Sequence, residues 1–301
     1  MSKFFVGISL LAALVVGVAA CNRDPSAGGS RDASEPVKAM KASIALARSG
    51  DFAGLIKNML PPAEFERVRS EWNSRTNLDK PTDAERARFA DAMSRLTAPD
   101  AVETLFKDVE PDIRQFDAQY QQQMPTIVAM GKTYVRGLVQ QSQGLSPGEK
   151  QQAGQVIETL SQWIEKTRFT DPAKVRQVIG ILSDTARKLD LKTLDEAQAL
   201  TFEQSSPKLK IALDGIKQVL EIYDFSIDAT LDSMTVEPIT IDADTARLKI
   251  SYSLLGTPLT SETEMVRIED RWYGKDTIEK IKERAATSAA AKPPVLTPEN
   301  G

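Results

Sequence analysis

The chain has 301 residues, 41% hydrophobic and 27% charged, and its 38 basic and 42 acidic residues give a net charge of −4. This mild charge gives no reason to expect a nucleic-acid partner, because nucleic-acid binding needs a concentrated basic face. The chain has no histidine and one cysteine, which excludes Ser-His-Asp and Cys-His sites, an internal disulfide and Cys-rich zinc sites. No cofactor is predicted, and carboxylate, Ser-Lys, tyrosine or Ca²⁺/Mg²⁺ chemistry remains open.

The first 20 residues have the pattern of a secretory signal. Lys3 precedes a run of 17 uncharged residues, 4–20, which is shorter than most membrane-spanning helices. The run ends in Val18-Ala19-Ala20-Cys21, which resembles the lipobox of bacterial lipoproteins. The resemblance implies that residues 1–20 are a lipoprotein signal peptide and that Cys21 is acylated and anchors the protein in a membrane. The alternatives are ordinary signal-peptidase cleavage beside an unrelated cysteine, or an uncleaved anchor helix.

Residues 21–35 are expected to be a flexible tether, since 22–35 contain no large apolar side chain. Fourteen residues span at most about 45 Å, so the folded body would lie close to the membrane surface. Asn22 follows the cysteine where retention in the inner membrane commonly uses Asp. The lipoprotein resemblance therefore implies the periplasmic face of the outer membrane, with the inner membrane as the alternative.

Residues 36–223 show helical periodicity almost throughout, which predicts a helical, bundle-like domain. Pro36 suits a first helical turn. Three segments place Glu three residues after Thr or Ser, the capping-box pattern that begins a helix: 82–85, 146–149 and 193–196. Glutamines form three clusters in this region, at 119–123, 140–143 and 151–152, and most of them lie opposite the apolar positions. We expect a solvated face there, with hydrogen bonding to a glycan or a protein partner as the alternative.

Apolar residues recur at spacings of three and four along these helical segments. One such stripe consists of Ile127, Met130, Tyr134 and Leu138. Because each stripe covers only one side of a helix, we expect the helices to bury these faces against one another, and a ligand groove is the alternative. Glycines also occur inside the helical patterns, namely Gly131, Gly137, Gly154, Gly180 and Gly215. Close approach of helices is their expected reason, and a functional kink is the alternative.

From residue 224 the apolar period changes from 3.6 to 2. Residues 246–254 alternate apolar and polar side chains, as in a half-buried antiparallel strand. A turn, a second strand to Ile268, a tight turn and Trp272-Tyr273 follow, and the helix-like "TIEKIKER" ends the module at residue 284. This ending resembles NTF2-like or cystatin-like modules, in which strands curl around a helix. Residues 285–301, rich in Ala and Pro, are expected to form a disordered tail.

The predicted fold class is therefore α+β: a mainly helical, bundle-like body (36–223), a small antiparallel β module with a closing helix (224–284), and a disordered C-terminal tail.

Candidate catalytic and metal-binding groups are few. Asp242 and Asp244 lack the further oxygen ligands of a calcium loop, so a hairpin turn is favoured. Glu262 and Glu264 lie on one face of a strand at a separation that glycosidase carboxylate pairs can have. The segment 205–208 has Ser-x-x-Lys without the companion Lys-Thr-Gly of penicillin-binding enzymes. None of these is assigned as catalytic.

The sequence therefore favours a lipid-anchored envelope protein with a non-catalytic binding or scaffolding role. Its expected partners are the membrane, through Cys21, and an envelope protein or peptidoglycan. One alternative is a carboxylate-based enzyme that processes cell wall or lipid. The other is a small-lipid binder in which Tyr252, Leu254 and Trp272 line a void under the sheet.

Overall fold

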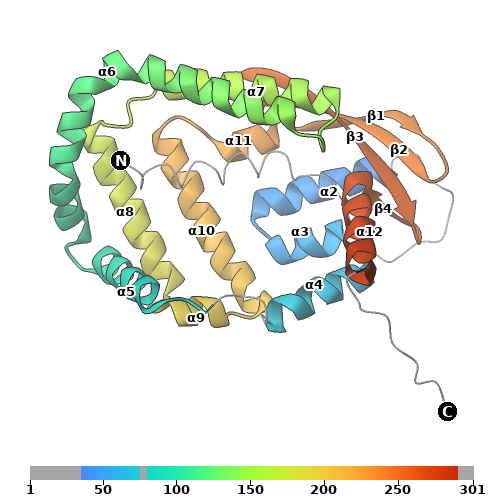
Figure 1. The fold of residues 1–301 in the computed structure, drawn as a ribbon, viewed down its shortest axis with the longest axis horizontal. Helices are drawn as coiled ribbons and strands as arrows, with labels where there is room; N and C mark the ends of the chain where they lie inside the picture. Colours follow the sequence, from blue (N-terminus) through green and yellow to red (C-terminus); the bar gives the residue numbers. More distant parts are fainter. Residues whose placement is uncertain (1–34, 75–79, 291–301) are drawn as a thin grey trace, which may run out of the picture.

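A computed structural model describes residues 35–74 and 80–290 and confirms the predicted fold class, a largely helical body followed by a small antiparallel sheet (Figure 1). The helices are α2 (Glu35–Ser49), α3 (Phe52–Met59), α4 (Pro62–Ser74), α5 (Asp83–Thr97), α6 (Ala101–Gln141), α7 (Pro147–Lys166), α8 (Pro172–Leu189), α9 (Leu194–Ala199), α10 (Phe202–Ile222), α11 (Ile227–Asp232) and α12 (Lys275–Ala290). The strands are β1 (Thr235–Ile241), β2 (Thr245–Leu254), β3 (Thr257–Ile268) and β4 (Arg271–Gly274). Helix α12 thus continues to Ala290, six residues into the range expected to be tail.

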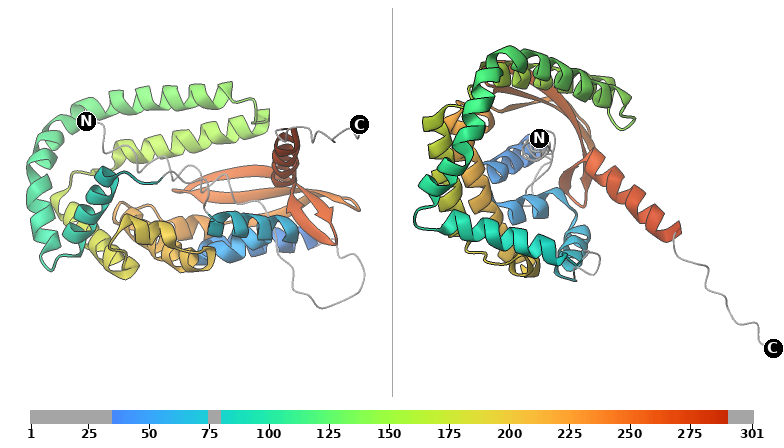
Figure 2. Two further views of the ribbon diagram at one scale, coloured as in Figure 1. Left: turned by 60° about the horizontal axis from the view of Figure 1, so that its bottom comes forward. Right: turned by 60° about the vertical axis from the view of Figure 1, so that its left-hand side comes forward.

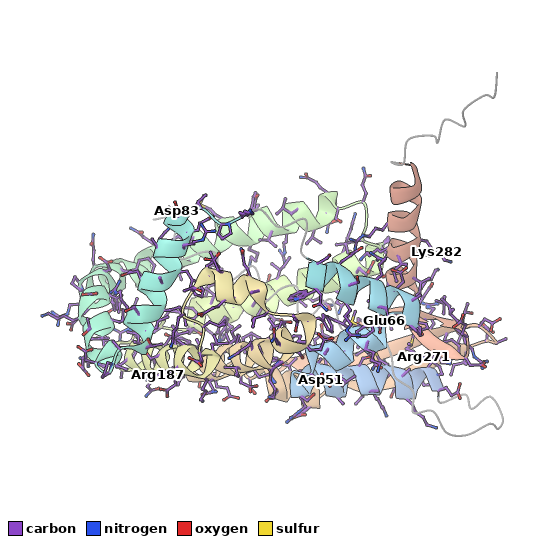
Figure 3. The ribbon with its side chains drawn as sticks, turned by 90° about the horizontal axis from the view of Figure 1, so that it is seen from below. Asp51, Glu66, Asp83, Arg187, Arg271 and Lys282 are labelled. Carbon is purple, nitrogen blue, oxygen red and sulfur yellow. The ribbon has the colours of Figure 1, made fainter. Side chains whose placement is uncertain are left out.

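Helix starts follow local sequence signals. All three predicted capping boxes are present, at the beginnings of α5, α7 and α9, and Thr201 and Gln204 form another at α10. Between α2 and α3, Gly50 has φ +71° and Asp51 accepts a hydrogen bond from the Gly54 N–H at 2.8 Å (Figure 3). These contacts satisfy backbone groups that a helix end leaves without partners.

The sheet is an antiparallel meander in the order β1-β2-β3-β4. Two tight turns join its later strands, with positive φ at Leu255 and Gly256 and again at Glu269 and Asp270, as two-residue hairpin loops require. The predicted alternation along β2 is confirmed, because its apolar residues from Ala246 to Leu254 are buried in register while their neighbours are more exposed.

The main hydrophobic core joins the two ends of the chain. Met40 of α2 is fully buried in one cluster with Leu248 of β2 and Met265 of β3, and α10 contributes Leu220. Burial of a side chain of this size stabilises the fold by about 1.5–3 kcal/mol. The core therefore crosses the boundary expected at residues 223 and 224, and the sheet packs against the first helix of the body.

Helix α6 extends over 41 residues and changes direction along its length (Figures 1 and 2). Pro111 and Pro125 lie inside it, and each lacks the N–H that a straight helix would use. Along the first half of α6, Arg176 of α8 lies over the Phe106 ring. The second half of α6 forms an antiparallel hairpin with α7 (Figure 2).

The stripe on the second half of α6 is exposed, so the prediction that it enters the core is wrong. Met130 is 69% exposed, Tyr134 68%, Leu138 53% and Ile127 38%. The reason lies in the position of α7, whose Glu158 pairs with Lys132 of α6, four residues after the buried Val128 and so on the same side of the helix. At 3.6 residues per turn, Val128 is about 100° around the helix from Ile127.

The helical glycines also differ from expectation. An ideal Cβ on Gly215 would lie 2.9 Å from Cγ2 of Thr185, so close approach is confirmed there. At Gly131, Gly137 and Gly154 a Cβ would meet no other atom within 4 Å, so that explanation is wrong for these three. Gly180 is in ordinary contact distance of Val102.

Candidate functional site

The lipobox and Cys21 lie outside the described residues. Within residues 35–74 and 80–290, no helix has the length and apolar character needed to cross a membrane.

The paired carboxylates of β3 are each matched with a cation. Glu262 accepts a hydrogen bond from Arg247, and Glu264 accepts one from Lys275 Nζ at 2.6 Å. The hydrogen bond and the charge of Lys275 hold the pKa of Glu264 below its usual value. A glycosidase needs one carboxylic acid with a raised pKa, so this exposed, ion-paired arrangement does not supply a general acid.

Asp242 and Asp244 form the turn between β1 and β2, as predicted. The Asp242 N–H donates to Thr245 O at 2.8 Å, and Thr245 Oγ1 lies 3.3 Å from Asp242 Oδ2. The carbonyl of Asp244 accepts from the Arg267 N–H at 2.9 Å. In the described part of the chain, no group of three or more His, Cys, Asp or Glu residues is placed to hold a metal ion.

The side chains of the Ser-x-x-Lys segment form hydrogen bonds within α10 and between α10 and α8. Ser205 Oγ donates to the carbonyl of Phe202 at 2.8 Å, and Lys208 Nζ donates to the carbonyl of Leu189 at the end of α8. Both groups are therefore used in helix packing, and neither activates the other.

The three residues proposed to line a lipid cavity are packed in the core. Tyr252, Leu254 and Trp272 belong to the same cluster as Met40 of α2. Gln152 of α7 donates a hydrogen bond to the Tyr252 hydroxyl at 3.1 Å, and burial raises the pKa of that hydroxyl. Side chains from α2 and α7 thus occupy the space that the lipid-binding alternative requires.

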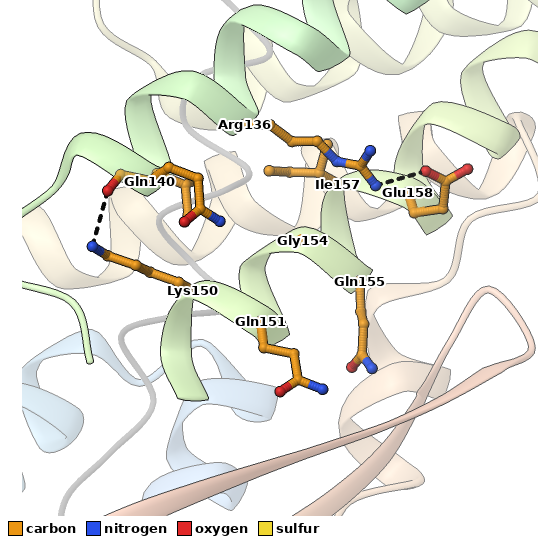
Figure 4. A pocket seen from close by; sticks show the side chains of 9 residues that line it. Arg136, Gln140, Lys150, Gln151, Gly154, Gln155, Ile157 and Glu158 are labelled. Atoms are coloured by element: carbon orange, nitrogen blue, oxygen red, sulfur yellow. Dashed lines mark hydrogen bonds and ion pairs between the residues drawn. The ribbon is translucent and has the colours of Figure 1, made fainter. Parts of the chain in front are cut away.

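A groove of about 500 Å³ lies between α6 and α7 (Figure 4). The residues that line it are Arg136, Val139, Gln140, Lys150, Gln151, Gly154, Gln155, Ile157 and Glu158. Gly154 leaves this part of α7 uncovered, since a Cβ there would meet nothing within 4 Å. The groove is a shallow surface lined mainly by polar side chains, although apolar atoms, including those of Val139 and Ile157, supply the larger part of its exposed area.

The charged groups of the groove are paired across the hairpin. Glu158 of α7 lies 2.9 Å from Arg136 Nη2 and 3.3 Å from Lys132 Nζ, both on α6. A hydrogen bond from Gln162, followed by one from Lys132, keeps the pKa of Glu158 below its usual value. Lys150 Nζ donates to the Gln140 carbonyl at 2.9 Å.

The glutamine amides of the groove have capacity for a ligand. Gln140, Gln151 and Gln155 are exposed, and no hydrogen bond joins the side-chain amide of any of them to another described residue. Figure 4 shows Gln151 and Gln155 extending from α7 on the side away from Gln140. Each amide has donors and an acceptor, so each suits a hydroxyl, amide or acetamido group. The side chains of 118–122, which include part of the first glutamine cluster, lie outside the description.

The sequence revealed three glutamine clusters, two of which contribute to the groove, but it did not reveal the groove itself. Gln140 and Gln151 belong to the runs at 140–143 and 151–152, and Gly154 was expected to mark close helix approach, whereas Gln155 lies outside every run. The groove depends on how α6 and α7 pair, which a glutamine count does not reveal. Comparison with family models, curated protein sequences and solved structures finds no match for the chain.

Proposed function

We propose that this chain is a lipid-anchored cell-envelope protein with a non-catalytic binding or scaffolding role, and that the groove between α6 and α7 is its contact surface. The observation that carries the proposal is the set of exposed amides in that groove without hydrogen-bond partners among the described residues. Acyl chains on Cys21 would hold the protein at the membrane, because each buried CH₂ contributes about 0.8 kcal/mol. Asn22 favours the periplasmic face of the outer membrane.

The groove chemistry favours an uncharged polar partner. Arg136 and Glu158 neutralise each other, so an ionic ligand gains little from either. The remaining charged side chain of the lining, Lys150, donates to the Gln140 carbonyl and gives the groove a mild positive charge. The amides offer donors and acceptors in a mixed arrangement, which matches the hydroxyl and acetamido groups of a peptidoglycan strand or the backbone of a protein segment.

The test is binding to purified peptidoglycan together with crosslinking in envelope fractions. The full chain is incubated with sacculi and sedimented, and parallel cells are treated with a crosslinker before purification. Gly154→Leu fills the groove, whereas Gly148→Leu adds the same side chain to an open position of α7 outside the groove lining. We expect Gly154→Leu to lose at least tenfold in binding and Gly148→Leu to bind like the wild type. Absence of sedimentation and of any reproducible crosslinked partner for the wild-type chain contradicts the proposal.

A further inference from the structure

The exposed stripe of α6 is an apolar surface that the described fold leaves open. It consists of Ile127, Met130, Tyr134 and Leu138 and is defined here as the α6 stripe. Contiguous exposed apolar surface of this kind marks interaction sites on soluble proteins. The ion pairs of Lys132 and Arg136 with Glu158 show that α7 lies along a different side of this half of α6.

The segment of α6 that carries the α6 stripe is almost uncharged, together with the residues that join it to α7. Residues 118–148 contain no carboxylate, and their only cations, Lys132 and Arg136, already pair with Glu158. A second uncharged surface therefore meets the α6 stripe without burying an unpaired charge. The α6 stripe of a second copy is such an uncharged surface, because the two copies have the same sequence.

The α6 stripe is also complementary to itself in an antiparallel arrangement. Two antiparallel helices that cross between Lys132 and Thr133 place position 127 opposite position 138, and position 131 opposite position 134. Ile127 then meets Leu138 of the second copy. The large Tyr134 ring faces Gly131 of the second copy, where a Cβ would meet nothing within 4 Å. Both pairs occur twice, as a two-fold interface requires.

We propose that the chain forms a two-fold dimer in which the α6 stripes of two copies pack antiparallel. The four exposed side chains supply a few hundred Å² of apolar surface, on the order of the largest patches on monomeric proteins. A stable dimer buries about 800 Å² on each partner, so flanking residues of α6 complete the interface. We expect a dimer that dissociates in the micromolar range.

The register is tested by disulfide crosslinking of the full chain in cell membranes. Differently tagged Ile127→Cys and Leu138→Cys chains are co-expressed and oxidised with copper-phenanthroline. Crosslinking is expected between the two variants but not within either one, because like positions lie 11 residues apart, about 16 Å along the helix. The wild-type chain, with Cys21 alone, gives the background. A 127–127 crosslink at equal yield, or no 127–138 crosslink above background, overturns the proposal.

A second measurement follows the mass of the purified full chain in detergent by analytical ultracentrifugation. The wild type should change from monomer to dimer as the chain concentration rises from about 1 to about 100 μM. Tyr134→Lys should weaken dimerisation at least tenfold. Ile239→Lys, at a 41% exposed position on β1, should leave it unchanged. A wild type that stays monomeric at 100 μM refutes the dimer. Sacculus binding by Tyr134→Lys separates this outcome from the groove, which that substitution does not touch.

Discussion

The contrast between Gly137 and Gly215 provides a quantitative test of helix packing in this fold. Both glycines lie inside helices, where replacement by alanine favours the helix by up to about 1 kcal/mol. At Gly137 the added Cβ meets no atom within 4 Å, so the full gain should be seen. At Gly215 the Cβ would lie 2.9 Å from Cγ2 and 3.2 Å from Cβ of Thr185. The neighbouring Cβ is fixed to the backbone of α8, so rotation of the threonine cannot remove the clash.

The two substitutions should therefore have opposite signs. Overpacking of this kind costs about 1–3 kcal/mol, which exceeds the gain in helix propensity, and Gly215→Ala should lose about 1 kcal/mol net. For a chain of this size, each 1 kcal/mol shifts Tm by about 2–4 °C. Circular dichroism melts and urea unfolding should show Gly137→Ala above the wild type and Gly215→Ala below it.

The double variant Thr185→Ala/Gly215→Ala serves as the control. Removal of the threonine Oγ1 and Cγ2 relieves most of the clash, so the double variant should recover stability relative to Gly215→Ala. If Gly215→Ala stabilises the chain as much as Gly137→Ala, then α8 and α10 do not approach as closely as the structure has them, and the reasoning fails.

Three further predictions concern the anchor, a buried lysine and an acid-sensitive contact. Cys21→Ala should abolish incorporation of an alkyne-palmitate label and release the chain from the membrane fraction, and a wild type without label contradicts lipidation. Lys217, 7% exposed, donates to the Arg48 carbonyl at 2.8 Å and lies 2.6 Å from Asp228, so Lys217→Met should cost about 2 kcal/mol in urea unfolding after allowance for the partly exposed Asp228. The control Lys210→Met loses only an exposed pair and should change stability by less than about 0.5 kcal/mol. Hydrogen bonds from Arg168 and then Thr170 keep the pKa of Asp117 below its usual value, so its contribution to stability is present above about pH 4 and is lost as the pH falls through the folded-state pKa. Asp117→Asn should therefore reduce the loss of Tm between pH 5 and 3, as melts at buffered pH would measure, and an unchanged slope contradicts the role of this contact.

The candidate site could be predicted only in part. The glutamine clusters were visible in the sequence, but their interpretation as a solvated face did not reveal a groove. That groove depends on the pairing of α6 with α7, in which Arg136 and Lys132 contact Glu158 and the Gln140 carbonyl accepts from Lys150. Likewise, Glu262 and Glu264 were correctly placed on one strand, but their pairing with Arg247 and Lys275 depends on the neighbouring strand and on the start of α12.

The sequence by itself determined the elements whose causes are local. The capping boxes at Thr82, Ser146 and Thr193 join residues three apart, and the alternation of β2 follows from the pleat of one strand. Tertiary structure alone decided which apolar faces are buried. A helical stripe states which side of a helix is apolar, whereas burial needs a neighbour placed by distant parts of the chain. Met40 packs against a sheet that lies some 200 residues later in the chain. The α6 stripe has no such neighbour among the described elements, because α7 lies against a different side of α6.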